Sequence, residues 1–281
     1  MASPDAIAPW WLSGTPLEVE HRRLMRGRHR PIPWADSTAP ALPADDRALL
    51  ADTWRRRARA EYLAISTFSV LSMDLCAAGA PADVLSLVHR SAIDEVRHAE
   101  LCVRLAALYG GGEAPPPAGM SDLPDDPVRP RREQAVANAL LVSCVAETVA
   151  TVVLATLRQD VTDPVVKAVL GVIYADEVSH ARLGWSYLTY NLRAGGDRFK
   201  EVAAAMIPVA VRGAANVVDA PKPEDATSPL RKAHGFVTAG EERALFAHTV
   251  REVLAPGFEA LGISPGGIVE AFGEPWVARA S

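Results

Sequence analysis

Two short stretches of this chain each place a glutamate and a histidine three residues apart, a spacing that presents both side chains on one face of a helix. They are Asp94-Glu95-Val96-Arg97-His98 and Asp176-Glu177-Val178-Ser179-His180. A carboxylate oxygen and an imidazole nitrogen so placed can hold one metal ion. A lone E-x-x-H match arises readily by chance, as at Glu18 and His21, but two copies preceded by Asp do not. The chain is therefore predicted to bind two metal ions.

The segments around these motifs are predicted to be four long helices in two hairpins. Residues 45–78 have an acidic start and recurring apolar positions, with Glu61 in their middle. Residues 81–109 carry the first motif and open on a proline, which suits a first helical turn. Residues 131–159 carry Glu147, and residues 165–192 carry the second motif. The chain thus repeats one unit, a lone glutamate on a helix followed by D-E-x-x-H on the returning helix.

A linker rich in Gly and Pro joins the two hairpins. Residues 110–130 contain Gly110-Gly111-Gly112 and Pro115-Pro116-Pro117, which exclude a helix or strand interior. At about 3.3 Å per residue this linker can run the length of a long helix, so it predicts a crossover rather than a domain boundary. Two hairpins joined by a long crossover form a four-helix bundle of the ferritin type, here over residues 45–194.

The remaining residues are predicted to flank this all-α bundle. Residues 1–44 form an extension rich in Pro and Trp with only short regular structure, anchored by the rings of Trp10, Trp11 and Trp34. No strong helical pattern surrounds Glu18 and His21 there. Residues 195–281 are expected to add helices at 197–218 and 241–261, and a short segment after Pro265, that pack on the bundle.

The composition argues against several other classes. The formal net charge is −5, which does not favour nucleic acid, and the basic run at residues 21–30 is best interpreted as a solvated arm. Three cysteines without a C-x-x-C pair fit a reducing cytoplasm. Residues 1–9 lack the pattern of a signal peptide. The apolar stretch 140–157 has Glu147 near its centre, which fits a buried bundle helix better than a membrane span.

Surface charges on amphipathic helices are the alternative interpretation of the motif residues. Apolar side chains flank both motifs, for example Ile93 and Ala99 around the first and Ile173 and Ala181 around the second. A lone buried carboxylate is costly unless it is paired or bound to a metal. The flanking residues therefore favour a buried metal site.

These residues resemble the metal site of the ferritin-like di-iron carboxylate proteins, which take one Glu from each of two helices and Glu-x-x-His from two others. The resemblance covers about residues 45–192 and fills six ligand positions: Glu61, Glu95, His98, Glu147, Glu177 and His180. It implies that Glu95 and Glu177 bridge the metals, while each metal also receives one His and one terminal Glu. These ligands suit two iron ions, a manganese/iron pair or two manganese ions, and argue against magnesium or calcium.

Four further positions resemble the hydroxylase component of bacterial multicomponent monooxygenases. Asp94 and Asp176 occupy the place of carboxylates that orient the His ligands, and Arg97 that of an arginine that pairs with such an Asp. Ser179 departs from this pattern in the second motif. Cys102 matches a cysteine near the metals, although small core filling is the alternative.

Two more residues are candidates for the pocket. Thr151 matches a threonine that assists proton delivery, and the alternative is a hydroxyl bonded to its own helix carbonyl. Tyr174 lies one turn before Glu177 and is expected either to line the pocket or to pack in the core. Of the other histidines, His89 is expected off the metal face, His234 exposed in a loop, and His248 at a packed or surface position rather than as a ligand.

Other branches of this superfamily match less well. Cys102 stands where radical-forming ribonucleotide reductase subunits place Tyr, and Ile173 where arylamine N-oxygenases place an extra His. The sequence also lacks the rubredoxin-type cysteine pairs of rubrerythrins. The resemblance is therefore best to the oxygenases with a two-histidine site.

The resemblance implies an O2-activating non-haem di-iron oxidoreductase in the cytoplasm. Two reduced metals about 3.5 to 4 Å apart bind O2 as co-substrate, and a peroxo or high-valent di-metal species hydroxylates or otherwise oxidises a small organic substrate. An external electron donor, a reductase or a ferredoxin, is expected, and a homodimer is compatible with the resemblance. The alternative is a ferritin- or rubrerythrin-like iron oxidase, peroxidase or storage protein. The long extensions outside the bundle favour the oxygenase.

Overall fold

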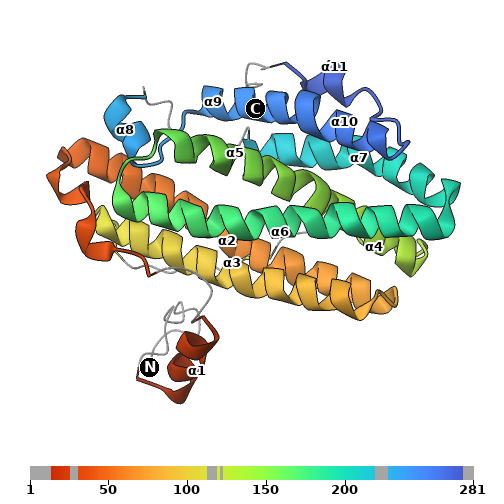
Figure 1. The fold of residues 1–281 in the computed structure, drawn as a ribbon, viewed down its shortest axis with the longest axis horizontal. Coiled ribbons are helices and arrows are strands. Elements are labelled where there is room, and N and C mark those ends of the chain that lie inside the picture. Colours follow the sequence, from red (N-terminus) through yellow and green to blue (C-terminus); the bar gives the residue numbers. More distant parts are fainter. Residues whose placement is uncertain (1–13, 26–30, 113–118, 121–122, 219–226, 275–281) are drawn as a thin grey trace.

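A computed structural model of the chain shows long helices lying side by side (Figure 1). It describes residues 14–25, 31–112, 119–120, 123–218 and 227–274, and all regular structure within them is helical. The elements are α1 Pro16–Leu24, η1 Trp34–Asp36, η2 Ala39–Ala41, α2 Ala44–Ala77, α3 Ala82–Leu108, α4 Arg131–Ala139, η3 Leu140–Ala146, α5 Glu147–Asp160, α6 Pro164–Gly195, α7 Asp197–Val218, α8 Pro229–Ala233, α9 Ala239–Thr249, η4 Val250–Leu254, α10 Ala255–Ala260 and α11 Ile268–Phe272. The prediction of an all-α fold is confirmed.

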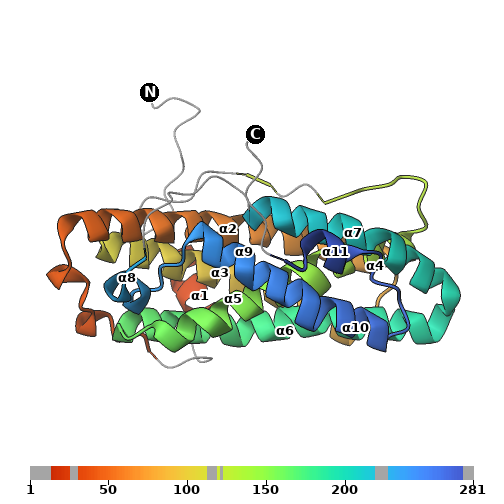
Figure 2. The same cartoon turned by 90° about the horizontal axis from the view of Figure 1, so that it is seen from above.

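Helices α2 and α3 form the first hairpin (Figure 2). The first turn of α2 contains Asp45 and Asp46, where the helix dipole favours negative charge. Gly79 in the connecting turn has a φ of 65°, a conformation that glycine adopts without a steric penalty. Helix α3 begins directly after Pro81. The predicted helices 45–78 and 81–109 are thus confirmed.

The second hairpin contains an irregularity that its sequence pattern does not reveal. The predicted helix 131–159 is continuous, but its middle part, η3, is π-helical. A π-helical turn is wider than an α-helical one and changes the direction of the side chains that follow. The first of these is Glu147. The turn into α6 is closed by Asp163, whose carboxylate accepts hydrogen bonds from the backbone N–H groups of Val165 and Val166.

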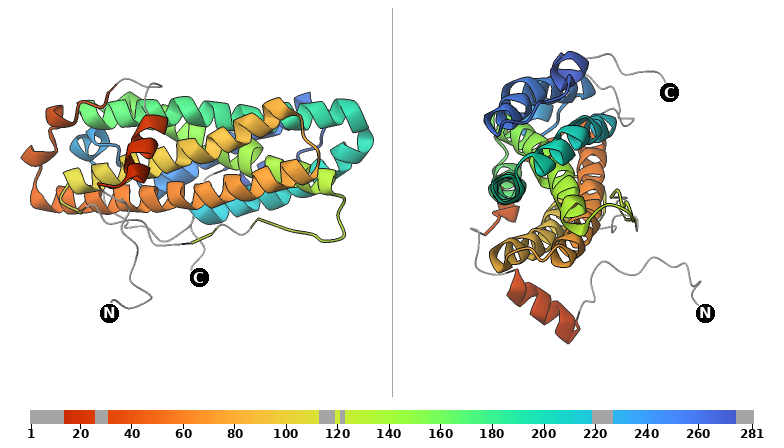
Figure 3. Two further views of the ribbon diagram at one scale, coloured as in Figure 1. Left: turned by 90° about the horizontal axis from the view of Figure 1, so that it is seen from below. Right: turned by 90° about the vertical axis from the view of Figure 1, so that its right-hand side faces the viewer.

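The two hairpins pack against each other and carry the C-terminal helices on one side (Figure 3). Helix α6 contacts α3, α5 and η3, and α2 contacts α4 as well as α3. Helix α7 packs on η3 and α4, and α9 packs on α5. The C-terminal helices therefore lie mainly against the second hairpin.

Two apolar clusters fill the interior on either side of the motif residues. One includes Phe68 and Leu71 of α2, Val88 of α3 and Leu183 of α6. The other includes Trp54 of α2, Leu105 of α3, and Val169 and Leu170 of α6. Burying each such side chain is worth roughly 1.5–3 kcal/mol. On α2, α3 and α6 the predicted ligands lie between the two clusters, so apolar packing on both sides holds polar residues inside the protein.

The N-terminal extension is only partly described. Trp34 lies under the guanidinium of Arg104 of α3, 4.2 Å from the ring centroid, while Trp10 and Trp11 fall outside the described residues. Glu18 and His21 belong to α1, which Thr15 caps. This nine-residue helix is short, as expected for the extension, although no strong helical pattern in the sequence marks it.

Two helical stretches, Arg131–Asp160 and Asp197–Val218, are long and apolar enough to cross a membrane by length and composition alone. The first contains the candidate recognised in the sequence. Half of its most apolar window and a third of that of Asp197–Val218 are buried inside the protein. A buried core helix shows the same composition, and the absence of a membrane partner stays a prediction.

Candidate metal centre

The structure brings the six predicted ligands together. Among the described residues, two groups have ligand atoms that all lie within 4.8 Å of one another. The first group is Glu61, Glu95, His98 and Glu177, and the second is Glu95, Glu147, Glu177 and His180. Glu95 and Glu177 belong to both groups. Each group then adds one histidine and one glutamate of its own, which is the donor set that two bridged metal ions need.

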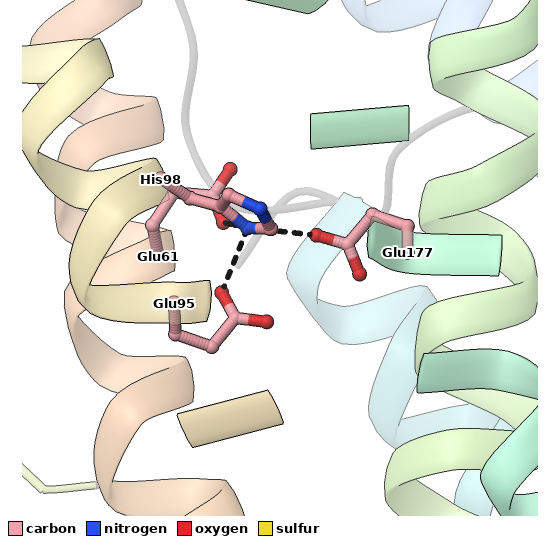
Figure 4. Close-up of side chains that lie close together, drawn as sticks. All are labelled: Glu61, Glu95, His98 and Glu177. Carbon is pink, nitrogen blue, oxygen red and sulfur yellow. Dashed lines mark ion pairs between the residues drawn. The ribbon is translucent and has the colours of Figure 1, made fainter. Parts of the chain in front are cut away.

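In the first group three carboxylates lie close to the same nitrogen of His98, and Figure 4 marks the ion pairs with Glu95 and Glu177. The Nδ1 atom lies 3.3 Å from Oε1 of Glu177, 3.4 Å from Oε2 of Glu95 and 3.6 Å from Oε2 of Glu61. Glu61 comes from α2, Glu95 from α3 and Glu177 from α6, so three helices meet at this imidazole.

The second group is arranged in the same way around His180. Its Nδ1 atom lies 3.0 Å from Oε1 of Glu95 and 3.0 Å from Oε2 of Glu177. Glu147 follows directly on the π-helical segment and is buried. The two imidazole rings are 5.9 Å apart between centroids. Each shared glutamate thus presents one oxygen to each histidine.

The outer nitrogens of the two histidines face aspartates. Nε2 of His98 lies 3.2 Å from Oδ2 of Asp176, and Nε2 of His180 lies 3.6 Å from Oδ2 of Asp94. Each aspartate belongs to the motif on the opposite helix. A carboxylate on the outer nitrogen fixes the ring orientation and leaves Nδ1 directed to the centre of the site.

One arginine contacts both aspartates. Nε of Arg90 donates a hydrogen bond of 3.2 Å to Oδ2 of Asp94, and its Nη2 lies 3.8 Å from Oδ1 of Asp176. The resemblance predicts Arg97 in this role, and the structure places Arg90 there instead. Arg90 lies one helical turn before Asp94 on the same side of α3, a spacing that could have identified it.

The centre of the site contains buried polar atoms that lie near groups of opposite charge but make no hydrogen bond. Glu95, His98, Glu177 and His180 are each at most 3% exposed. Neither carboxylate oxygen of Glu95 makes a hydrogen bond, nor does Nδ1 of His98. Such buried atoms are normally bonded in folded proteins. Metal ions between the carboxylates and the imidazoles would provide the missing partners, so the residues present fit a two-metal centre.

The pKa values reflect the crowding of negative charge. Burial raises the pKa of Glu61 to about 7, and Glu95 adds to this rise while His98 opposes it. Burial and the carboxylate of Glu177 raise the pKa of Glu147 well above its ordinary value. Burial lowers the pKa of His98, but the neighbouring carboxylates, Glu95 first, raise it well above the usual range. Without metal, bound protons therefore neutralise charge that metal ions would otherwise neutralise.

Three further predicted residues lie around the centre in different settings. Cys102 is fully buried, and burial together with the charge of Glu61 raises the pKa of its thiol well above its ordinary value. Thr151 donates its hydroxyl to the carbonyl of Glu147 at 2.7 Å, the alternative role considered for it. Tyr174 is half-buried under the guanidinium of Arg158, 4.6 Å from its ring centroid. Cys102 is not in a metal-ligand group formed by the described part of the chain.

The structure also shows where three other histidines, for which the sequence analysis gave expectations, are located. His89 and His248 are exposed, and neither belongs to a ligand group among the described residues. The expectation of an exposed His234 is wrong, because the residue is buried and only 2% exposed. Its Nδ1 atom lies 2.8 Å from the hydroxyl of Tyr109, and its Nε2 lies 3.3 Å from the hydroxyl of Thr38. A loop position therefore concealed a buried histidine that joins distant segments.

Comparisons with protein families, with curated proteins and with solved structures found no match to this chain. Functional conclusions therefore rest on the site itself.

Proposed function

We propose that this chain is an O2-activating non-haem di-iron oxygenase or oxidase that acts on a small organic substrate. The supporting observation is the pair of Glu/His groups that share Glu95 and Glu177. Two redox-active metal ions held by these groups would supply the chemistry that activates O2. Iron, a manganese/iron pair and two manganese ions are all compatible with the oxygen and nitrogen donors.

The fold that goes with this function is a ferritin-like four-helix bundle. We assign its helices to α2, α3, η3 with α5, and α6, because each contributes at least one residue to the two ligand groups. Residues 110–130, of which 113–118 and 121–122 lie outside the described residues, are predicted to form the crossover between the hairpins. The N-terminal extension and the helices from α7 onward would then enclose the bundle.

Each metal ion would have two ligand residues of its own and two that it shares with the other ion. Glu61 and His98 would bind one ion, Glu147 and His180 the other, and Glu95 and Glu177 both. Asp94, Asp176 and Arg90 keep the two imidazoles in place. Most of the site is closed to water, and Glu61 is its most open ligand, with 18% of its side chain exposed. Substrate and O2 are therefore expected to approach from the side of Glu61.

The proposal includes an external electron donor, a cytoplasmic location, and neither nucleic acid nor a membrane as partner. A homodimer is compatible with it. The alternative function is iron oxidation, peroxide removal or iron storage in the manner of ferritins and rubrerythrins. The extensions around the helices favour an enclosed substrate over a bare storage cage.

An iron titration separates the two functions. The metal-free protein is loaded anaerobically with Fe(II), O2 is admitted, and iron per chain and O2 consumption are measured with and without candidate organic substrates. Two irons per chain and a substrate-accelerated transient absorption are expected for the oxygenase. Many tens of irons per chain, or a 24-subunit particle by light scattering, would overturn the proposal in favour of storage.

A further inference from the structure

A basic surface lies directly outside the two histidines of the proposed metal centre. We call it the α3/α6 face and define it by six residues: Leu87, Arg90, Ile93 and Arg97 of α3, and Ser179 and Arg182 of α6. Its arginines carry three positive charges, although the whole chain has a formal net charge of −5. Asp94 and Asp176, beneath Arg90, are both buried. The accessible charge of this face is therefore positive.

Acidic residues lie beyond both ends of the α3/α6 face along α3. Asp83 is exposed but lies at the first turn of α3, about two turns from Arg90. Glu100 lies beyond Arg97 and pairs with His21 of α1 at 3.5 Å. Helix α1 crosses α3 at that end, and no other described helix lies over α3 and α6 on this side, as the view from below shows (Figure 3).

The face also exposes apolar side chains. Leu87 is 45% exposed and Ile93 is 38% exposed, on either side of Arg90. Exposed leucine and isoleucine ringed by arginines have the character of a protein contact surface, with an apolar centre and a charged rim. A symmetric contact between two copies of this chain would bring the same arginines face to face, which like-charge repulsion opposes.

Arg90 links this surface to both ligand histidines through buried carboxylates. Its side chain is 40% exposed, yet its guanidinium reaches Asp94 at 3.2 Å and Asp176 at 3.8 Å. Asp94 lies 3.6 Å from His180, and Asp176 lies 3.2 Å from His98. Arg90 and one aspartate thus connect the solvent with each imidazole. Each contact along these two paths is shorter than 4 Å.

We infer that the α3/α6 face docks an acidic one-electron carrier protein and that its electrons reach the metal centre through Arg90, the two aspartates and the two histidines. This inference rests on the proposed function, because it needs a reducible centre. Each docked carrier is oxidised by one electron and the centre is reduced by one, so two encounters reduce both metals. The positive face steers the negative partner, and the exposed Leu87 and Ile93 provide the contact.

The test uses the full chain loaded with iron and oxidised by O2. A reduced, acidic [2Fe–2S] ferredoxin serves as the probe, and stopped-flow absorbance follows its oxidation under anaerobic conditions. The double variant Arg97→Glu/Arg182→Glu is expected to lower the second-order rate constant about tenfold or more, and salt is expected to lower the wild-type rate. The control is Arg55→Glu, which reverses an exposed arginine on α2 and should leave the rate unchanged.

A chemical reductant separates failure of docking from failure of the proposed function. Dithionite needs no docking surface, so it should reduce the wild type and the double variant at the same rate. A wild type that dithionite cannot reduce contradicts the di-iron function itself. Equal ferredoxin rates for the wild type and the double variant, with no effect of salt, would overturn the docking site. Conversion of a dimer to a monomer by Arg182→Glu would also overturn it, because a second copy would then cover this face.

Arg90→Lys tests the electron path at constant charge. Lysine keeps the positive charge but cannot bridge two carboxylates in the way that the guanidinium does. The limiting rate at saturating ferredoxin should fall several-fold, whereas the ferredoxin concentration that gives half the limiting rate should stay the same. An unchanged limiting rate would show that electrons do not pass through Arg90.

Discussion

Oδ2 of Asp176 lies 3.2 Å from Nε2 of His98, although Asp176 belongs to α6 and His98 to α3. The reverse contact joins Asp94 of α3 to His180 of α6 at 3.6 Å. Each D-E-x-x-H motif therefore supplies the histidine of one group, a glutamate that both groups share, and the aspartate that orients the histidine of the other group. The two copies of the motif therefore depend on each other for the orientation of their histidines.

The first prediction concerns these aspartates. Asp176→Asn removes the charge that holds the ring of His98, and metal affinity is expected to fall 10- to 100-fold, the usual cost of losing such a contact. Asp94→Asn should have a smaller effect because its contact is longer. Competition with a chromophoric chelator measures the affinity. Asp83→Asn, at an exposed site on α3, is the control, and equal affinity in all four proteins would contradict the orienting role.

The second prediction separates shared from unique ligands. Glu95→Ala removes a donor from both groups, so both metals should be lost or bound weakly. Glu61→Ala removes a donor from the first group only, and Glu147→Ala from the second only, so each should retain about one tightly bound metal per chain. Elemental analysis after gel filtration gives the stoichiometry, and circular dichroism checks folding. Two tightly bound metals in Glu147→Ala would exclude Glu147 from the ligand set.

The third prediction concerns pH and the metal-free protein. The pKa of Glu61 is raised from 4.5 to about 7 by burial, so the folded state binds its proton more tightly than the unfolded state. When a carboxyl group has a higher pKa in the folded state than in the unfolded state, the folded protein loses stability as the pH rises from the lower of these pKa values to the higher. Between about pH 5 and 7, Glu61 should therefore reduce the free energy of unfolding, by an amount on the order of a few kcal/mol. Urea unfolding at several pH values measures this.

Glu61→Gln provides the comparison for the pH effect. Glutamine has a similar shape and does not ionise, so the metal-free variant should gain stability relative to the wild type as pH rises through this window. Bound metal should reverse the difference, because it stabilises the ionised carboxylate. A constant difference between wild type and variant from pH 5 to 8 would contradict the raised pKa.

The ligand set could be predicted because it depends on short spacings and on neighbouring residues in the sequence. The three-residue spacing from Glu95 to His98 and from Glu177 to His180 needs only a helix to bring each pair together, and apolar flanks show that the helix is buried. Long, strongly periodic helices are also the elements that sequence patterns identify best. The positions of Glu61 and Glu147 followed from repetition of the same unit.

Contacts between distant segments could not be predicted in this way. Arg90 rather than Arg97 reaches Asp176, because α3 and α6 approach each other in a particular rotation. His234 is buried through a partner 125 residues away, Tyr109, which no local pattern around a Gly-containing loop can indicate. The π-helical segment before Glu147 has the composition of an ordinary helix, and its contacts are with α6 and α7, two segments that follow it in the chain.

The fourth prediction tests the buried role of His234. The hydroxyl of Tyr109 pairs with Nδ1 of His234, and Thr38 connects the ring to the carboxylate of Asp163. His234→Ala leaves the buried Tyr109 hydroxyl without its partner, at a cost of about 1–3 kcal/mol. Thermal denaturation should show a lower Tm, while metal stoichiometry stays at two per chain. His248→Ala, at an exposed histidine, should change neither quantity.

The fifth prediction concerns the contact that positions Glu147. Gly184 of α6 packs so closely on η3 that a Cβ atom there would lie 2.5 Å from Cβ of Ser143 and 2.7 Å from the backbone nitrogen of Cys144. Backbone cannot move aside as a flexible side chain can, so Gly184→Ala must push α6 away from η3. The cost of such overpacking is typically about 1–3 kcal/mol. Because η3 leads directly into Glu147, affinity at the second metal group should fall together with the Tm.

Gly171→Ala is the matched control on the same helix. A Cβ atom at Gly171 meets nothing within 4 Å, so alanine should stabilise α6 by about 0.5–1 kcal/mol through its better helix propensity. Opposite signs for the two variants in urea unfolding would show that the close approach of α6 to η3, rather than the loss of a helical glycine, produces the effect. Stabilisation by both substitutions would mean that α6 does not pack tightly on η3. The position of Glu147 would then be determined by α5 alone.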